Sequence, residues 1–188
     1  MTTLTHPLAA ISPNQRARVL TPLLLATLII TFLFRFIGPA QPTVGGTPTV
    51  GGTPTIVDFE LAGSVDQAAQ IINAWNENDR IRAGFSLGFD YLYMPVYSTT
   101  IALACVMAAG ALKRKTWATI GLLLAWGLWL AAFLDAIENL ALFTELLGGN
   151  VAPWPQVAQI CATIKFGLIL LGLLYVVGGV IGKIVARK

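Results

Sequence analysis

The chain has 188 residues, of which 56% are hydrophobic and only 11% are charged, and its mean hydropathy is +0.74. This composition is too apolar for a soluble domain and places the chain among integral membrane proteins. The net charge of +3 gives no reason to expect a nucleic-acid partner, because membrane topology accounts for the excess of basic residues.

Four apolar stretches are each long enough for a helix to cross a hydrocarbon core of about 30 Å. We therefore predict an all-α membrane protein, a bundle of four transmembrane helices over residues 19–38, 87–112, 117–143 and 157–182. The first stretch is expected to be a helix and not a cleavable signal peptide. Its apolar run is longer than that of a signal peptide, and Pro39 spoils the cleavage site that would follow it.

The segments between these stretches differ in charge. The N-terminal tail (1–18), the turn at 113–116 and the C-terminal tail (183–188) are basic and contain no carboxylate. All nine carboxylates fall in or beyond the opposite half of the predicted membrane. The positive-inside bias therefore predicts a multi-pass protein of a bacterial cell (inner) membrane with both termini cytoplasmic.

The segment between the first two helices divides into a linker and a helix. Residues 39–58 contain a six-residue Pro-Thr-Val-Gly-Gly-Thr repeat, whose Gly and Pro content prevents regular structure. Residues 59–86 are predicted to form an amphipathic helix on the outer side, which Ser64 and Gln67 would cap. This helix could lie flat on the outer leaflet or dock on its own bundle, and we favour docking. Residues 144–156 are predicted to be an outer loop.

Cysteine and histidine limit the chemistry. Cys105 and Cys161 lie within predicted membrane helices, where small apolar thiols are expected and no disulfide is required. His6 is the single histidine and is expected to be a solvated residue of the tail. A haem or metal site built on several histidines is therefore not available, and no metal ligand, catalytic residue or cofactor is predicted.

The predicted membrane helices nevertheless retain five charged side chains. A charge near the bilayer centre costs at least about 2.5 kcal/mol. Two of the helices run outward and two run inward, yet every charge falls in the outer half, so one shared pocket is the economical explanation. The charged residues are Arg35, Asp90, Asp135, Glu138 and Lys165.

Helical spacing adds neighbours to these charges. Asp135 shares a face with residues three and four positions later, and Asp90 with residues three and seven positions later. Glu145 is expected at or beyond the outer end of the third helix, where a carboxylate needs no partner. The predicted ligand-binding or proton site consists of Arg35, Asp90, Tyr93, Tyr97, Asp135, Glu138, Asn139 and Lys165.

The charge count of this cluster allows two interpretations. Three acids face two bases, so the fully ionised cluster would carry one negative charge. Either one carboxyl keeps its proton, or a cation or cationic ligand supplies the balance. The alternative is a set of structural ion pairs that hold the helices together without any chemistry.

Several short motifs resemble those of a group of small, uncharacterised bacterial four-helix membrane proteins. They are Phe59-Glu60-Leu61-Ala62, Trp75, Gly88 to Tyr93 with Tyr97, Leu134-Asp135 with Glu138-Asn139, and Cys161-Ala162 with Lys165-Phe166. The resemblance covers about residues 56–180. It implies a fold and a membrane location, and no activity.

Three functions remain open from the sequence. In the first, the charged pocket binds a small molecule, a lipid headgroup or a cation from the outer leaflet. In the second, the chain is an accessory or structural subunit of a larger membrane complex, and the charges are interhelical contacts. In the third, a carboxyl pair performs intramembrane acid–base catalysis. The chain lacks HExxH, GxSxG, P-loop and CxxC motifs, so we favour a function without catalysis.

Overall fold

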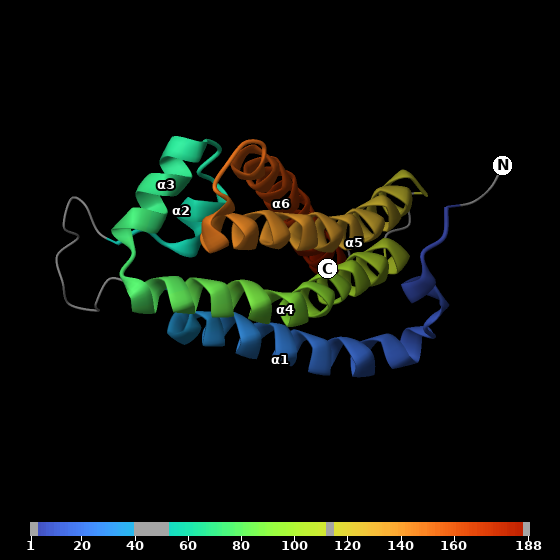
Figure 1. Cartoon of the computed structure of the whole chain (residues 1–188). Helices are drawn as coiled ribbons and strands as arrows, with labels where there is room; N and C mark the ends of the chain where they lie inside the picture. The colour runs from blue at the N-terminus through green and yellow to red at the C-terminus, as the bar shows by residue number, and fades with distance from the viewer. Residues whose placement is uncertain (1–3, 40–52, 112–114, 186–188) are drawn as a thin grey trace. The chain divides into compact units, whose positions relative to one another are not determined.

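The computed structural model describes residues 4–39, 53–111 and 115–185 of the chain. Every regular element within these residues is helical. Four helices are long and apolar enough to cross a membrane, which confirms the predicted fold class at this level. They are α1 (Pro13–Ile37), α4 (Glu77–Ala111), α5 (Lys115–Thr144) and α6 (Trp154–Val185) (Figure 1).

The segment predicted as one amphipathic helix over 59–86 is divided into three pieces. It comprises the short helix α2 (Ile56–Glu60), the helix α3 (Val65–Ala74) and the first turns of α4. The part of the repeat linker from 40 to 52 lies outside the described residues. Figure 1 shows α2 and α3 as separate helices that precede α4.

Side-chain caps and backbone angles explain the divisions. Thr55 and Asp58 form a capping box at the start of α2, and the Ser64 side chain accepts a hydrogen bond from the Gln67 N–H at the start of α3. Between these helices Gly63 has a φ of 70°, which a residue with a side chain rarely adopts. Trp75 is extended, with φ −82° and ψ 132°, so α3 ends before α4 begins.

The N-terminal segment is not a solvated tail, and this prediction was wrong. His6 is only 2% exposed and precedes a 3₁₀ helix, η1 (Pro7–Ala10). Its ring lies 4.8 Å from the ring of Trp126 and 4.5 Å from that of Trp129, centroid to centroid. The Trp126 indole N–H also donates to the Thr5 carbonyl, at 2.9 Å. Two tryptophans of α5 therefore bury the histidine.

The chain separates into two compact units, and each long helix contributes residues to both. Unit 1 consists of Met1–Leu28, Met94–Phe133 and Ile164–Lys188, and unit 2 of Ile29–Tyr93 and Leu134–Thr163. Helix α1 lies alongside α4 (Figure 1). Thr27 and Thr100 share a hydrogen bond of 2.9 Å in unit 1, and Thr31 and Tyr93 share one of 2.7 Å in unit 2.

Each unit has its own apolar core. The core of unit 2 brings α2 and α3 against the long helices, and it includes Phe59, Ala68, Trp75, Leu87, Leu142 and Ala158. The core of unit 1 is formed mainly by small and aliphatic residues together with one tyrosine, and it includes Ala102, Cys105, Ala108, Ala125, Leu128 and Tyr175. Trp75 is 2% exposed, so α3 packs on its own helices and does not present this ring at a lipid surface.

Candidate functional site

The polar centre of unit 2 is a contact between α4 and α5. The Asn139 amide nitrogen donates to the Asp90 carboxylate at 2.8 Å and to the Leu87 carbonyl at 3.3 Å. Asn139 is 1% exposed, and Asp90 is half-buried. One side chain of α5 thus holds both a carboxylate and a main-chain carbonyl of α4, which fixes the two helices against each other.

The buried face of α5 carries carboxyl groups beside this amide. Asp135 is 2% exposed and Glu138 is fully buried. They share the helical face predicted from the sequence, because Glu138 and Asn139 lie three and four residues after Asp135. Asp135, Glu138 and Asn139 all belong to unit 2, together with Asp90. The structure therefore collects three acids and one amide of the predicted site in one unit.

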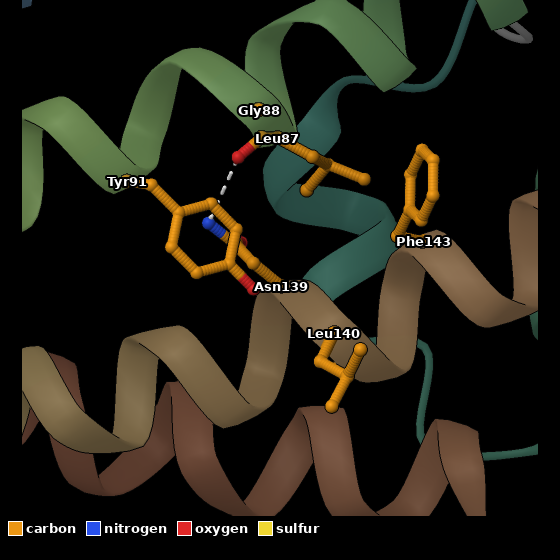
Figure 2. A pocket seen from close by; sticks show the side chains of 6 residues that line it. All are labelled: Leu87, Gly88, Tyr91, Asn139, Leu140 and Phe143. Atoms are coloured by element: carbon orange, nitrogen blue, oxygen red, sulfur yellow. Dashed lines mark hydrogen bonds between the residues drawn. The ribbon is translucent and has the colours of Figure 1, made fainter.

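A cavity of about 150 Å³ lies next to this contact, between α4 and α5 (Figure 2). Its walls are mostly apolar, and Asn139 and Tyr91 are the lining residues that carry polar side-chain groups. Figure 2 shows the Asn139 amide nitrogen directed toward the Leu87 carbonyl beside the Tyr91 ring. The cavity is lined by Leu87, Gly88, Tyr91, Asn139, Leu140 and Phe143.

The cavity lies at the exposed flank of the helix pair. Leu140 is 55% exposed, Tyr91 is 48% exposed and Phe143 is 42% exposed. These side chains belong to α4 and α5 within segments long and apolar enough to cross a membrane. A cavity on this flank could therefore receive the apolar part of a molecule that is dissolved in the bilayer.

Tyr91 is a site residue that the sequence did not identify. Its hydroxyl donates to the Ala136 carbonyl of α5 at 3.1 Å, and its ring forms one wall of the cavity. Its spacing from Leu87, four residues earlier, places both on the face of α4 that meets α5. This spacing of four residues could have identified Tyr91 as a site residue from the sequence.

Tyr93, which was predicted beside Asp90, also contacts α1. Its hydroxyl shares the hydrogen bond with Thr31, and its ring lies 5.4 Å from the Phe34 ring, centroid to centroid. Arg35 of α1 is exposed and makes no hydrogen bond or ion pair among the described residues. The structure therefore brings Tyr93 into unit 2 but does not direct Arg35 into the acidic cluster.

The remaining two predicted site residues belong to unit 1. Tyr97 is 3% exposed and Lys165 is 5% exposed. The Lys165 ammonium nitrogen lies 4.6 Å from the centroid of the Phe166 ring, a cation–π distance. Both side chains are buried, although each carries a polar group within a long apolar helix.

Glu145 is buried, whereas its position at the end of the third helix predicted a carboxylate that needs no partner. It is 1% exposed, and neither carboxylate oxygen has a hydrogen-bond partner in the described chain. The carboxyl belongs to a single π-helical turn, η2 (Glu145–Gly149), which follows α5 and ends where Gly148 has a φ of 97°. A spacing of seven residues from the buried Glu138 places Glu145 on the buried face, and this spacing could have identified it.

The thiols and the metal-binding side chains offer little further chemistry. Cys105 and Cys161 are both buried thiols. Cys105 donates to the Gly172 carbonyl with a sulfur–oxygen distance of 3.6 Å. Within 4–39, 53–111 and 115–185, no three His, Cys, Asp or Glu side chains are grouped so that they could hold a metal ion.

Comparisons with protein-family models, with curated proteins and with solved structures find no match for the chain. The resemblance to bacterial four-helix membrane proteins therefore stays a prediction. Any functional conclusion depends on the geometry of unit 2.

Proposed function

We propose that the chain is a multi-pass protein of a bacterial inner membrane that binds an amphipathic molecule between α4 and α5. The apolar part of the ligand occupies the cavity beside Tyr91 and Leu140. Its cationic or hydrogen-bond-donating head lies against Asp90 and Asn139. Lipid headgroups with an amine and free amphipathic amines share this chemistry.

The observation that carries this proposal is an apolar cavity that adjoins a buried polar contact. Ligand sites in proteins are mostly apolar, with a few polar groups that fix the orientation of the ligand. The cavity has this composition, since its polar side-chain groups are the Asn139 amide and the Tyr91 hydroxyl. The Asn139–Asp90 hydrogen bond of 2.8 Å holds this amide in one orientation.

The charges of unit 2 favour a cationic head. All nine carboxylates of the chain lie in the residues of unit 2, together with only three of the twelve basic residues. Those three, Arg35, Arg80 and Arg82, are exposed. A negative environment of this kind attracts a positively charged group and repels an anion.

The same charge division supports the predicted topology. Unit 1 contains nine basic residues and no acid, and these include the basic residues of the two terminal segments and of the turn at 113–115. We infer that the termini and this turn are cytoplasmic and that the cavity of unit 2 opens toward the outer leaflet. Fusion of a reporter that is active on only one side of the membrane to either terminus tests this orientation.

Native mass spectrometry of the protein in a mild detergent, combined with lipid extraction of the same sample, tests the binding proposal. We expect a discrete adduct, whose mass distinguishes a lipid from a free amine. Replacing Leu140 by Trp should fill the cavity and remove the adduct. The control is Leu130→Trp, because Leu130 is also an exposed residue of α5, at 50%, but does not line the cavity.

Three results would contradict this proposal. One is a parent protein that carries no adduct, and another is an adduct that survives Leu140→Trp. The third comes from a thermal-shift comparison of dodecylamine with dodecanol, which share the alkyl chain: equal stabilisation would show that the site does not select a cationic head. Protein subunits that purify with the chain in place of a ligand would support the accessory function.

A further inference from the structure

Glu145 is a buried carboxyl that the proposed binding site does not use. Each of its carboxylate oxygens is buried and accepts no hydrogen bond, and no basic side chain in the described residues pairs with it. An ionised carboxylate without a donor or counter-ion is among the least favourable groups in a protein interior. The side chain therefore needs a different means of neutralisation.

The surroundings of Glu145 are apolar. Leu142, three residues before Glu145, belongs to the core of unit 2, and Leu146, the next residue along the chain, packs against that core. That core is completed by residues of α2, α3, α4 and α6, such as Phe59 and Ala158. A low-dielectric environment of this kind favours the neutral acid over the anion.

The charged groups on the packed elements do not alter this conclusion. Within unit 2, the α6 segment Trp154–Thr163 has no ionisable side chain except Cys161. The bases of unit 2 are Arg35, Arg80 and Arg82, and all three are exposed. Arg80 and Arg82 donate to the carbonyls of Ile72 and Phe36. The acids on these elements are Asp58, Glu60, Asp66, Glu77, Asp79 and Asp90, and each would oppose a second negative charge.

We propose that Glu145 is a reversible proton-binding site, held as the neutral carboxylic acid at the end of α5. Seven residues separate it from Glu138, which is about 10 Å along the helix axis on the same face. Glu145 is thus the carboxyl of this face that lies nearest the end of the helix. It exchanges its proton as unit 2 opens locally, and the ligand class of the site is the proton itself.

A neutral buried acid has a characteristic reaction with hydrophobic carbodiimides. The carboxyl proton moves to one carbodiimide nitrogen while the carboxyl oxygen bonds to the central carbon. The acyl group then shifts from oxygen to nitrogen and leaves a stable N-acylurea. No atom departs in either step, so the adduct retains the whole mass of one reagent molecule.

Infrared spectroscopy of the protein in liposomes tests the proposal directly. We expect the parent protein at neutral pH to show the carbonyl stretch of a protonated carboxylic acid. Subtracting the spectrum of the Glu145→Gln variant from that of the parent should isolate this band. The matched control is Glu77→Gln, because Glu77 is exposed to water at the start of α4. That variant should retain the whole band. A difference spectrum without the band would overturn the proposal.

Carbodiimide labelling followed by peptide mass spectrometry tests whether the proton exchanges. Label should appear at Glu145 but not at Glu77, and it should fall by about tenfold per pH unit once the acid ionises. Glu145→Gln should fold as well as the parent, because the amide is neutral and has the same shape. Suppression of the label by Na⁺ or Ca²⁺ at constant pH would assign the site to a metal cation and contradict the proposal.

Discussion

Unit 1 and unit 2 are built from segments of the same four long helices but contain different kinds of core. In unit 1 the helices approach closely at glycines: a Cβ added to Gly172 would lie 2.8 Å from a methyl of Leu128, and one added to Gly179 would lie 2.9 Å from the Cβ of Ala108. In unit 2 the buried face of α5 carries Asp135, Glu138 and Asn139, and the buried Glu145 follows in η2. Unit 1 is thus stabilised mainly by close packing at small residues, and unit 2 is stabilised partly by polar contacts.

The comparison shows why the two units should respond to different substitutions. Helices in a membrane associate without a hydrophobic driving force, so close packing at small residues supplies much of the stability. Buried polar side chains add directional contacts, but each one is costly when its partner is removed. Unit 1 should therefore be sensitive to added volume, and unit 2 to the loss of a donor.

The largest effect is expected for Asn139→Ala in unit 2. The Asp90 carboxylate and the Leu87 carbonyl would both lose the Asn139 donor. Removing one partner of a buried charged contact costs about 3 kcal/mol, which should appear as a lower free energy of unfolding in detergent titration. Leu140→Ala is the control. Its side chain is exposed, and the change should cost less than about 1 kcal/mol.

A double-mutant cycle separates this contact from a simple loss of packing. Asp90→Ala combined with Asn139→Ala should cost less than the sum of the two single changes, because the double variant removes both partners. Strictly additive costs would show that the hydrogen bond contributes no coupling. Unit 2 would then resemble unit 1, and the comparison between the units would fail.

A smaller effect is expected for Gly179→Ala in unit 1. The new methyl group would meet the Cβ of Ala108, which is fixed to the backbone of α4 and cannot rotate away. Overpacking of this kind costs about 2 kcal/mol, measured as a loss of thermal stability.

Gly178→Ala provides a matched control at the adjacent position. Gly178 is exposed, and nothing lies within 4 Å of the position that its Cβ would occupy. Alanine has a higher helix propensity than glycine, so this variant should be neutral or slightly stabilised. Equal losses at both positions would contradict the assignment of Gly179 to a close helix contact.

The sequence predicts where the long helices lie along the chain better than it predicts which face of each helix meets which neighbouring helix. Hydropathy identifies the four long helices, and spacing places Asp135, Glu138 and Asn139 on one face of α5. Spacing within one helix cannot show which neighbouring helix a face will meet. For this reason the spacing predicts Tyr93 as a site residue beside Asp90, whereas Tyr91 is the tyrosine that lines the cavity.

Two further differences arise at the ends of helices. Glu145 was expected to need no partner because the apolar run ends at Phe143, but α2 and α3 add to the core in which its neighbours pack. His6 was expected in a free tail because no apolar run contains it. Long-range packing decides both positions, and local sequence does not encode that packing.

The smallest effect concerns this histidine, which makes the packing of the N-terminal segment in unit 1 depend on pH. Burial lowers the pKa of His6 below its ordinary value of 6.5. The folded state therefore favours the neutral ring, in which Nδ1 accepts the Leu8 N–H at 3.2 Å. The stability that depends on the neutral ring is complete above pH 6.5 and decreases as the pH falls toward the lowered pKa.

Acidification should accordingly release the N-terminal segment from α5, because a protonated Nδ1 can no longer accept the Leu8 N–H. Tryptophan fluorescence should report this through Trp126 and Trp129, which contact the His6 ring, with a midpoint below pH 6.5. The transition should be absent in His6→Phe, which keeps an aromatic ring and cannot titrate. A midpoint above pH 6.5 would mean that the folded chain stabilises the charged ring. In that case the two tryptophans would act as a cation site instead of an apolar cover.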